Sequence, residues 1–234
     1  MRLIAWNANY NAHRRTFEQD VEFLYGMNPD VIVLSETKAP INDDPEHIGW
    51  FGEPGKPGLG VIARNSYSIA DCGQNKEAPR WFAGFRVMGP CPFNLLAAWP
   101  TQYPKRPRYG ELLNSALDYF GAFLEGGRSA LVGDLNSSSD VLSQKKSHGE
   151  FVAKAAGLGL QSVYHAPSNR PHGGEPDKTY RHGGKGKGLF HIDYCFLSPA
   201  LLDGAKIEVL KDEEWKRRSD HSPIYVEIPN PTQV

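Results

Sequence analysis

Apolar positions along the chain follow two patterns, one typical of buried strands and one of helices. Short, nearly continuous apolar runs predict strands at residues 2–6, 31–34, 58–64, 67–72, 81–87, 93–99, 130–132, 192–197, 205–210 and 222–228. Apolar residues three and four apart predict helices over 14–25 and 109–124, and a shorter helix is expected over 150–156. Strands and helices interleave along the whole chain, so we expect one α/β domain comprising residues 1–234.

One long segment, residues 167–188, has neither pattern and is rich in Pro, Gly and Lys. In a compact domain, a loop of this length usually carries function or moves. We therefore include it among the candidate functional segments.

The composition is that of a globular protein, since 40% of the 234 residues are hydrophobic and 23% are charged. The apolar runs are too short to span a bilayer, and asparagines fall where a secretory signal needs an apolar core. We expect a cytoplasmic protein that acts as a monomer, without a membrane partner. The cysteines are widely spaced and form no C-x-x-C pair, which disfavours a disulfide framework and a zinc knuckle; they are Cys72, Cys91 and Cys195.

Polar side chains recur where predicted strands end. Asn7, Glu36, Asp134 with Asn136, and Asp193 each follow or end an apolar run. Any one of them is explained by the preference of Asp and Asn for turns. Strand ends of a layered sheet meet at one edge, however, and carboxylates gathered there repel one another unless a cation lies among them. Oxygen ligands of this kind suit Mg²⁺, with Mn²⁺ as a substitute.

A further polar group, Ser219-Asp220-His221, directly precedes the last predicted strand. A carboxylate that accepts the Nδ1 proton of His221 would orient the ring and favour its charged form, and Asp193 can supply it. The other seven histidines are interpreted as ordinary surface or core residues.

In this order, the motifs Trp-Asn7, Pro-Asp-Val-Ile-Val-Leu-Ser-Glu36, Gly-Asp134-Leu-Asn136, His-Ile-Asp193-Tyr and Ser-Asp220-His221-Ser-Pro resemble the endonuclease/exonuclease/phosphatase superfamily. That superfamily includes exonuclease III, the AP endonucleases and pancreatic-type deoxyribonuclease. The resemblance covers residues 2–228. It implies a four-layered αββα sandwich, in which two packed mixed β-sheets are flanked by helices and carry a metal-lined cleft at one edge.

The resemblance also implies a role for each motif residue. Glu36 would be the principal metal ligand, with Asn7 and Asp220 close to the same ion or to a second one. The attacking water or the scissile phosphate would be held by Asp134 and Asn136. His221 would contact the phosphate and Asp193 would orient it. Whether Asp134 or His221 takes the proton of the water is left open.

One position departs from the superfamily pattern. Where similar proteins carry a His or Tyr that contacts the phosphate, this chain has Trp99-Pro100-Thr101. Either Tyr103 supplies the contact from the following loop, or the indole of Trp99 packs and the contact is absent. We take Tyr103 as a candidate catalytic residue.

The net charge of -1 gives no overall attraction to nucleic acid, so the positions of the basic residues matter. They gather near the motifs, at 105–108, 145–146, 178–187 and 216–218, although charged loops are also common without a ligand. A basic rim suits a long polyanion. The segment that contains Tyr180 also resembles one that approaches unpaired nucleotides in exonuclease III and AP endonucleases. The candidate substrate-binding residues are Arg106, Arg108, Tyr180, Arg181, Lys185 and Lys187.

These observations favour a Mg²⁺-dependent phosphodiesterase that acts on nucleic acid, with DNA as the expected substrate. The competing hypothesis is a phosphatase or phosphodiesterase for a small phosphorylated metabolite or a lipid headgroup. A catalytically silent binding module is disfavoured because the motif residues are retained, apart from the position of Trp99.

Overall fold

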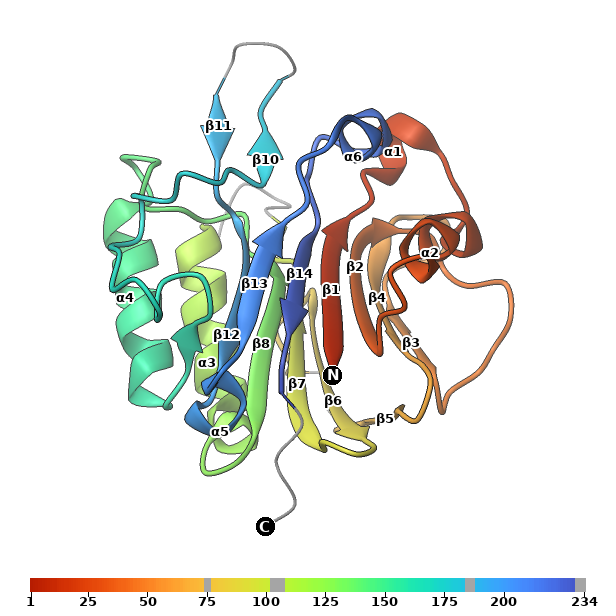
Figure 1. Ribbon diagram of the computed structural model, residues 1–234, viewed down its shortest axis with the longest axis horizontal. Coiled ribbons are helices and arrows are strands. Elements are labelled where there is room, and N and C mark those ends of the chain that lie inside the picture. Colours follow the sequence, from red (N-terminus) through yellow and green to blue (C-terminus); the bar gives the residue numbers. More distant parts are fainter. Residues whose placement is uncertain (74–76, 102–107, 184–187, 230–234) are drawn as a thin grey trace.

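The computed structural model describes residues 1–73, 77–101, 108–183 and 188–229, and its centre is two six-stranded sheets that pack face to face (Figure 1). The first sheet has the order β13-β14-β1-β2-β4-β3. Its strands β1 and β2 are parallel, and the other neighbours are antiparallel. The bounds are β1 (Arg2–Asn7), β2 (Val31–Thr37), β3 (Ile48–Phe51), β4 (Gly58–Ala63), β13 (Lys206–Val209) and β14 (Ile224–Glu227).

The second sheet has the order β5-β6-β7-β8-β12-β9, and only its pair β7–β8 is parallel. A separate two-stranded ribbon, β10 (Tyr180–Arg181) with β11 (Leu189–Phe190), projects beyond the end of the sandwich (Figure 1). The strands of the second sheet are β5 (Ser68–Asp71), β6 (Phe82–Met88), β7 (Phe93–Ala98), β8 (Ser129–Asp134), β9 (Gln161–Ser162) and β12 (Asp193–Leu197).

Helices cover the outer face of each sheet, which completes the predicted four-layered αββα sandwich (Figure 1). Helices α1 (Tyr10–His13), α2 (Phe17–Tyr25) and α6 (Glu213–Arg218) accompany the first sheet. Helices α3 (Tyr109–Leu124) and α4 (Lys145–Gly157) pack on the second, and α5 (Pro199–Leu202) follows β12. Among the described residues, no helix combines the length and the apolar character that a membrane span requires.

Burial on both faces explains why the central strands are continuously apolar. In β1, Leu3 and Ala5 belong to the core between the sheets, whereas Ile4 and Trp6 pack under the outer helices. Strands with one solvated face would have alternated apolar and polar residues instead. Cys91 and Cys195 are buried in the core, and Cys72 is half-buried.

Helix and strand bounds differ from the prediction in several places. The helix expected over 14–25 begins later, at Phe17 in α2, and Arg14 has a left-handed backbone (φ 56°) that ends the separate short helix α1. Helix α2 then starts from a capping box in which Thr16 and Gln19 bond each other's backbone. The helix expected over 150–156 begins earlier, at Lys145, and neither β3 nor α6 was predicted.

Candidate active site at one end of the sandwich

The topology brings the predicted strand-end residues to one rim of the sandwich. Asn7 ends β1, and its parallel neighbour β2 carries Glu36 close to its own end. Asp134 ends β8, and the antiparallel register pairs it directly with Asp193 at the start of β12. Four of the predicted site residues therefore meet here, through strand direction and register within each sheet and the packing of the two sheets face to face.

Asn7 links the two carboxylates of the rim. Its Nδ2 donates to Glu36 Oε1 at 3.1 Å and to Asp134 Oδ2 at 2.9 Å, and the side chain is 1% exposed. Its Oδ1 accepts from the backbone N–H of Asn9 at 2.9 Å, which sets the orientation of the amide. In this orientation the NH2 group of Asn7 faces both carboxylates and positions them, and its role as a metal ligand stays a prediction.

Glu36 lies at an irregularity of β2. Its backbone is left-handed (φ 50°), and the pairing register between β2 and β4 shifts between Leu34 and Thr37. A bulge of this kind re-aims a side chain, and left-handed backbone at a non-glycine residue is strained and common at functional sites. Burial, followed by the nearby charges of Asp220 and Asp193, raises the pKa of Glu36, although the Asn7 hydrogen bond opposes the shift.

His221 lies between two carboxylates. Its Nδ1 is 2.9 Å from Asp193 Oδ2, and its Nε2 is 3.9 Å from Asp134 Oδ2. Burial disfavours the charged ring, but Asp193 and then Asp134 outweigh burial and raise the pKa of His221 to about 10. The ring is therefore an imidazolium at neutral pH, oriented by Asp193 as predicted from the sequence.

Asp134 is the most heavily bonded carboxylate of the rim. Asn136 donates to it twice, from its backbone N–H (2.9 Å) and from Nδ2 (3.2 Å). Burial raises the pKa of Asp134 to about 7, against the lowering effect of His221. An acidic group with this pKa can hold or release a proton near neutral pH, which a carboxylate at the surface cannot do.

The loop before β14 positions Asp220. Asn9 Nδ2 donates to Asp220 Oδ1 at 2.8 Å, and Ser219 Oγ donates to the carbonyl of Asn7 at 2.7 Å. The backbone N–H of His221 in turn donates to Ser219 Oγ at 3.0 Å. Asn9 and Ser219 were not singled out from the sequence, although the spacing Asn7-x-Asn9 could have indicated a second amide beside the first.

The rim collects more negative than positive charge. His221 is the one basic side chain within ion-pair distance of its carboxylates in the part of the chain that the structure describes. A set of buried oxygen donors with this imbalance fits a hard divalent cation. The ligand atoms of Asp134, Asp193 and His221 also lie within 4.8 Å of one another. The carboxylates of the rim are Glu36, Asp134, Asp193 and Asp220.

A second cluster of titratable groups lies away from the rim, around Glu175 and His165. Glu175 Oε1 lies 3.0 Å from His165 Nε2, and the rings of His165 and His172 are stacked, with centroids 3.7 Å apart and planes 15° apart. A metal ion lies in the plane of each imidazole that binds it, so two nearly parallel stacked rings do not share one ion. With His148 Nε2 at 3.2 Å from His172 Nδ1, the cluster is a packed hydrogen-bonding group.

The predicted substrate-binding residues are placed unevenly. Tyr180 packs against His221, with ring centroids 4.6 Å apart. The guanidinium of Arg181 instead bonds Ser222 Oγ at 3.1 Å and the Ser219 carbonyl, so it holds the loop that carries His221. Arg108 is exposed at the start of α3. The remaining predicted residues lie outside the described part of the chain: Tyr103, Arg106, Lys185 and Lys187.

Tyr109 was missed as a site residue because the sequence marked it only as the start of a helix. Burial, and then the charges of Asp134 and Glu36, raise the pKa of Tyr109, which places its phenol near the rim. With Asn136 and Tyr180 it lines a pocket beside the His221 side of the rim. A helix pattern gives no indication that the first turn of α3 reaches a site built from strands.

Solved structures identify the fold. The 3′ phosphatase NExo from Neisseria, solved with a product DNA hairpin, is 19% identical to this chain, with a TM-score of 0.71 over 98% of this chain and 99% of NExo. An AP endonuclease from Archaeoglobus fulgidus is 16% identical, with a TM-score of 0.73 over 97% and 99% of the two chains. The endonuclease domain of TRAS1, a telomere-specific non-LTR retrotransposon, is 14% identical, with a TM-score of 0.68 and 97% coverage of both chains.

The chain has the endonuclease/exonuclease/phosphatase fold. The resemblance seen in the sequence motifs is therefore confirmed at the level of the fold. No protein-family model and no curated protein sequence matches the chain.

Proposed function

We propose that this chain is a divalent-metal-dependent phosphodiesterase that hydrolyses a nucleic-acid backbone, with DNA as its substrate. The observation that carries the proposal is the rim itself, where a charged imidazole lies among four carboxylates that need a cation. Structural neighbours that process DNA support it, among them the NExo structure with a DNA hairpin. Acidic ligands with a cation and an imidazolium suit a phosphodiester, which carries negative charge and gains more in the transition state.

In this proposal each residue has one task. Glu36 and Asp220 would hold Mg²⁺, which would supply polarisation of a phosphoryl oxygen and stabilisation of the charge on the leaving oxygen. Asp134, with its pKa near 7, orients the attacking water and accepts its proton. The imidazolium of His221 stabilises the charge that develops on the phosphoryl oxygens, because the alkaline pKa of the ring keeps it protonated and makes it a poor base.

The test is hydrolysis by the purified chain with Mg²⁺ and with EDTA. Four substrates separate the alternatives: a duplex with an abasic site, a single-stranded oligonucleotide, a supercoiled plasmid and a small phosphomonoester. Mg²⁺-dependent cleavage of any nucleic acid, lost in Glu36→Gln, supports the proposal. Turnover of the monoester alone would favour a phosphatase for small metabolites, and equal activity in EDTA would remove the metal from the mechanism.

A further inference from the structure

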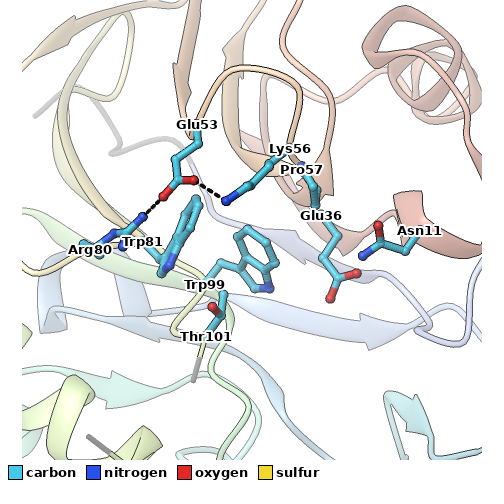
Figure 2. A pocket seen from close by; sticks show the side chains of 9 residues that line it. All are labelled: Asn11, Glu36, Glu53, Lys56, Pro57, Arg80, Trp81, Trp99 and Thr101. Carbon is cyan, nitrogen blue, oxygen red and sulfur yellow. Dashed lines mark hydrogen bonds and ion pairs between the residues drawn. The ribbon is translucent and has the colours of Figure 1, made fainter. Parts of the chain in front are cut away.

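A second pocket opens on the Glu36 side of the rim, with a volume of about 350 Å³ (Figure 2). Glu36 is the one motif residue among those that line it, and the carboxylate lies at one end of the pocket beside the indole of Trp99 (Figure 2). This volume falls within the range of small-ligand pockets. The lining residues are Asn11, Glu36, Glu53, Lys56, Pro57, Arg80, Trp81, Trp99 and Thr101.

Two tryptophans form the wall of this pocket. Trp81 precedes β6 and Trp99 follows β7, and the backbone N–H of Trp99 donates to the Trp81 carbonyl at 2.8 Å. Their rings meet edge to face, with centroids 5.0 Å apart. Trp99 is buried at 6% exposure, so it supports the wall, whereas Trp81 is half-buried and leaves part of its indole open to the pocket.

The backbone of Trp81 is unusual, because its φ of 69° is in the left-handed region that a bulky aromatic residue avoids. Such strain persists where the surrounding structure enforces it, and it concentrates at ligand clamps and active sites. At Trp81 it accompanies the turn into β6 that presents the indole to the pocket. If the side chain only filled space, an aromatic residue with ordinary extended backbone would do so equally well.

Two basic side chains lie at the edge of the pocket. The guanidinium of Arg80 lies 5.3 Å from the Trp81 ring and pairs with Glu53. Lys56 Nζ also pairs with Glu53, at 2.6 Å, so two positive groups share one carboxylate (Figure 2). The pocket therefore combines an aromatic wall, a net positive edge and, at its other end, the carboxylate proposed to hold the metal ion.

We propose that this pocket binds one nucleobase of the substrate strand, unstacked from its neighbours and packed on Trp81. The phosphate on one side of that nucleotide would lie at Glu36, where the metal would bind, and the phosphate on its other side would lie at the edge formed by Arg80 and Lys56. A base fits this combination because stacking on an aromatic ring tolerates any sequence and the flanking phosphates match the positive edge. This inference rests on the proposed function, because it places a nucleic-acid strand at the rim.

Binding can be tested without turnover. Thymidine 5′-monophosphate, with 2-deoxyribose 5-phosphate as the probe that lacks a base, is titrated into the protein while tryptophan fluorescence is followed. We expect quenching by the nucleotide only, and an affinity lower by roughly five- to a hundredfold in Trp81→Ala. Trp81→Phe keeps an aromatic ring, so its affinity should stay within a few-fold of wild type, while the amplitude of the quenching should fall because the Trp81 indole is gone. Trp50→Phe, which removes an indole that does not line the pocket, should leave both quenching and affinity unchanged.

Turnover gives an independent measurement. Thymidine 5′-(p-nitrophenyl phosphate) and methyl p-nitrophenyl phosphate share a leaving group, and only the first carries a sugar and a base. Trp81→Ala should raise KM for the thymidine ester about tenfold, with kcat within about twofold, and should leave the methyl ester unaffected. A merely structural role would lower kcat for both esters. Arg80→Ala, which leaves the indole in place, should give a smaller increase in KM for the thymidine ester.

The two proposals can fail separately. Hydrolysis of both esters by wild type with no preference for the base, unchanged in Trp81→Ala, would overturn the base pocket and leave the phosphodiesterase standing. Base-dependent quenching without hydrolysis of either ester or of DNA would overturn the proposed function and leave the pocket. If Trp81→Ala does not fold, equal quenching in Trp81→Phe and wild type, together with unchanged KM in Arg80→Ala, would count against the pocket.

Discussion

Asn7 and Asp134 belong to different sheets, and a hydrogen bond of 2.9 Å joins them across the end of the sandwich. The same amide group also donates to Glu36. Two carboxylates that would repel each other are thereby held in place by one neutral donor. Because the donor is neutral, the negative charges of the two carboxylates stay uncompensated and can bind a cation. Removing one of these charges should therefore change both metal-dependent activity and stability.

Glu36→Gln is expected to abolish metal-dependent turnover and, in EDTA, to raise the melting temperature. Burial and neighbouring carboxylates raise the pKa of Glu36, so the ionised form weakens the metal-free fold. Activity and thermal unfolding, each with Mg²⁺ and with EDTA, provide the measurement. Glu150→Gln, on an exposed ion pair of helix α4 with no proposed part in binding or catalysis, is the matched control and should retain turnover. A Glu36 variant that melts lower in EDTA would contradict the electrostatic argument.

Asp193→Asn should lower kcat by a factor on the order of a hundred or more, because the His221 ring loses both its orientation and much of its charge. Asp193 is the largest of the effects that raise the pKa of His221 to about 10. The pKa of His221 should therefore fall in the variant, and the alkaline limit of activity should move to lower pH. NMR titration of the His221 ring and a kcat–pH profile measure the two effects. An unchanged pKa of the His221 ring would refute the conclusion that Asp193 is what raises it.

Acid should destabilise the fold through the cluster of titratable groups around Glu175 and His165. Burial lowers the pKa of His148 to about 4 and that of His172 to about 3. A histidine whose folded-state pKa is depressed binds fewer protons folded than unfolded, so its full contribution is present above pH 6.5 and is lost as the pH falls toward the folded-state value. The lowered pKa of His148 alone corresponds to a decrease in the free energy of unfolding on the order of 3 kcal/mol between pH 6.5 and 4.

Melting temperatures measured from pH 7 to pH 4 check this expectation. His148→Gln should weaken the acid dependence, even if it lowers stability at pH 7. His47→Gln is the control, because His47 is partly exposed and pairs with Asp44 outside the cluster. A melting temperature that does not change between pH 6.5 and pH 4 in the wild type would show that the buried rings are not neutral in the folded protein.

DNA binding should weaken with salt, with a slope that corresponds to about three phosphate contacts. The estimate is low because Lys178, Lys216 and Arg218 each pair with a carboxylate of the protein. Reversing Lys185 and Lys187 to Glu should flatten the slope for every sequence alike, since phosphate contacts do not read bases. Fluorescence anisotropy with a labelled oligonucleotide over a salt series measures the slope. An unchanged slope would exclude the segment between β10 and β11 from the DNA contact.

Strand direction made much of the rim predictable. Asn7, Glu36 and Asp134 follow apolar runs that could only be buried strands, and parallel or paired strands bring such ends together. The orientation of the Asn7 amide was not predictable, because it depends on the backbone N–H of Asn9. The same holds for Lys178, whose partner Asp140 is 38 residues away.

The base pocket was not predictable either. Trp81 and Trp99 become neighbours only through the register of β6 with β7, and that register is not readable from either run alone. The later start of α2 was hidden as well, because apolar spacing reports helix faces and not a single left-handed residue such as Arg14. The histidine cluster escaped notice for a similar reason, since His148 comes from α4 and His165 from the segment after β9.

Because the rim joins two sheets, its geometry depends on how far apart they are held. Interlocking side chains such as Leu3, Val33, Leu95 and Val132 occupy the space between them, and in such sandwiches they set the separation. A substitution deep in that layer would slide Asn7 relative to Asp134 by a fraction of an ångström without touching any reacting group. Distant core mutations thus become a route by which selection, in nature or in the laboratory, tunes the proposed activity.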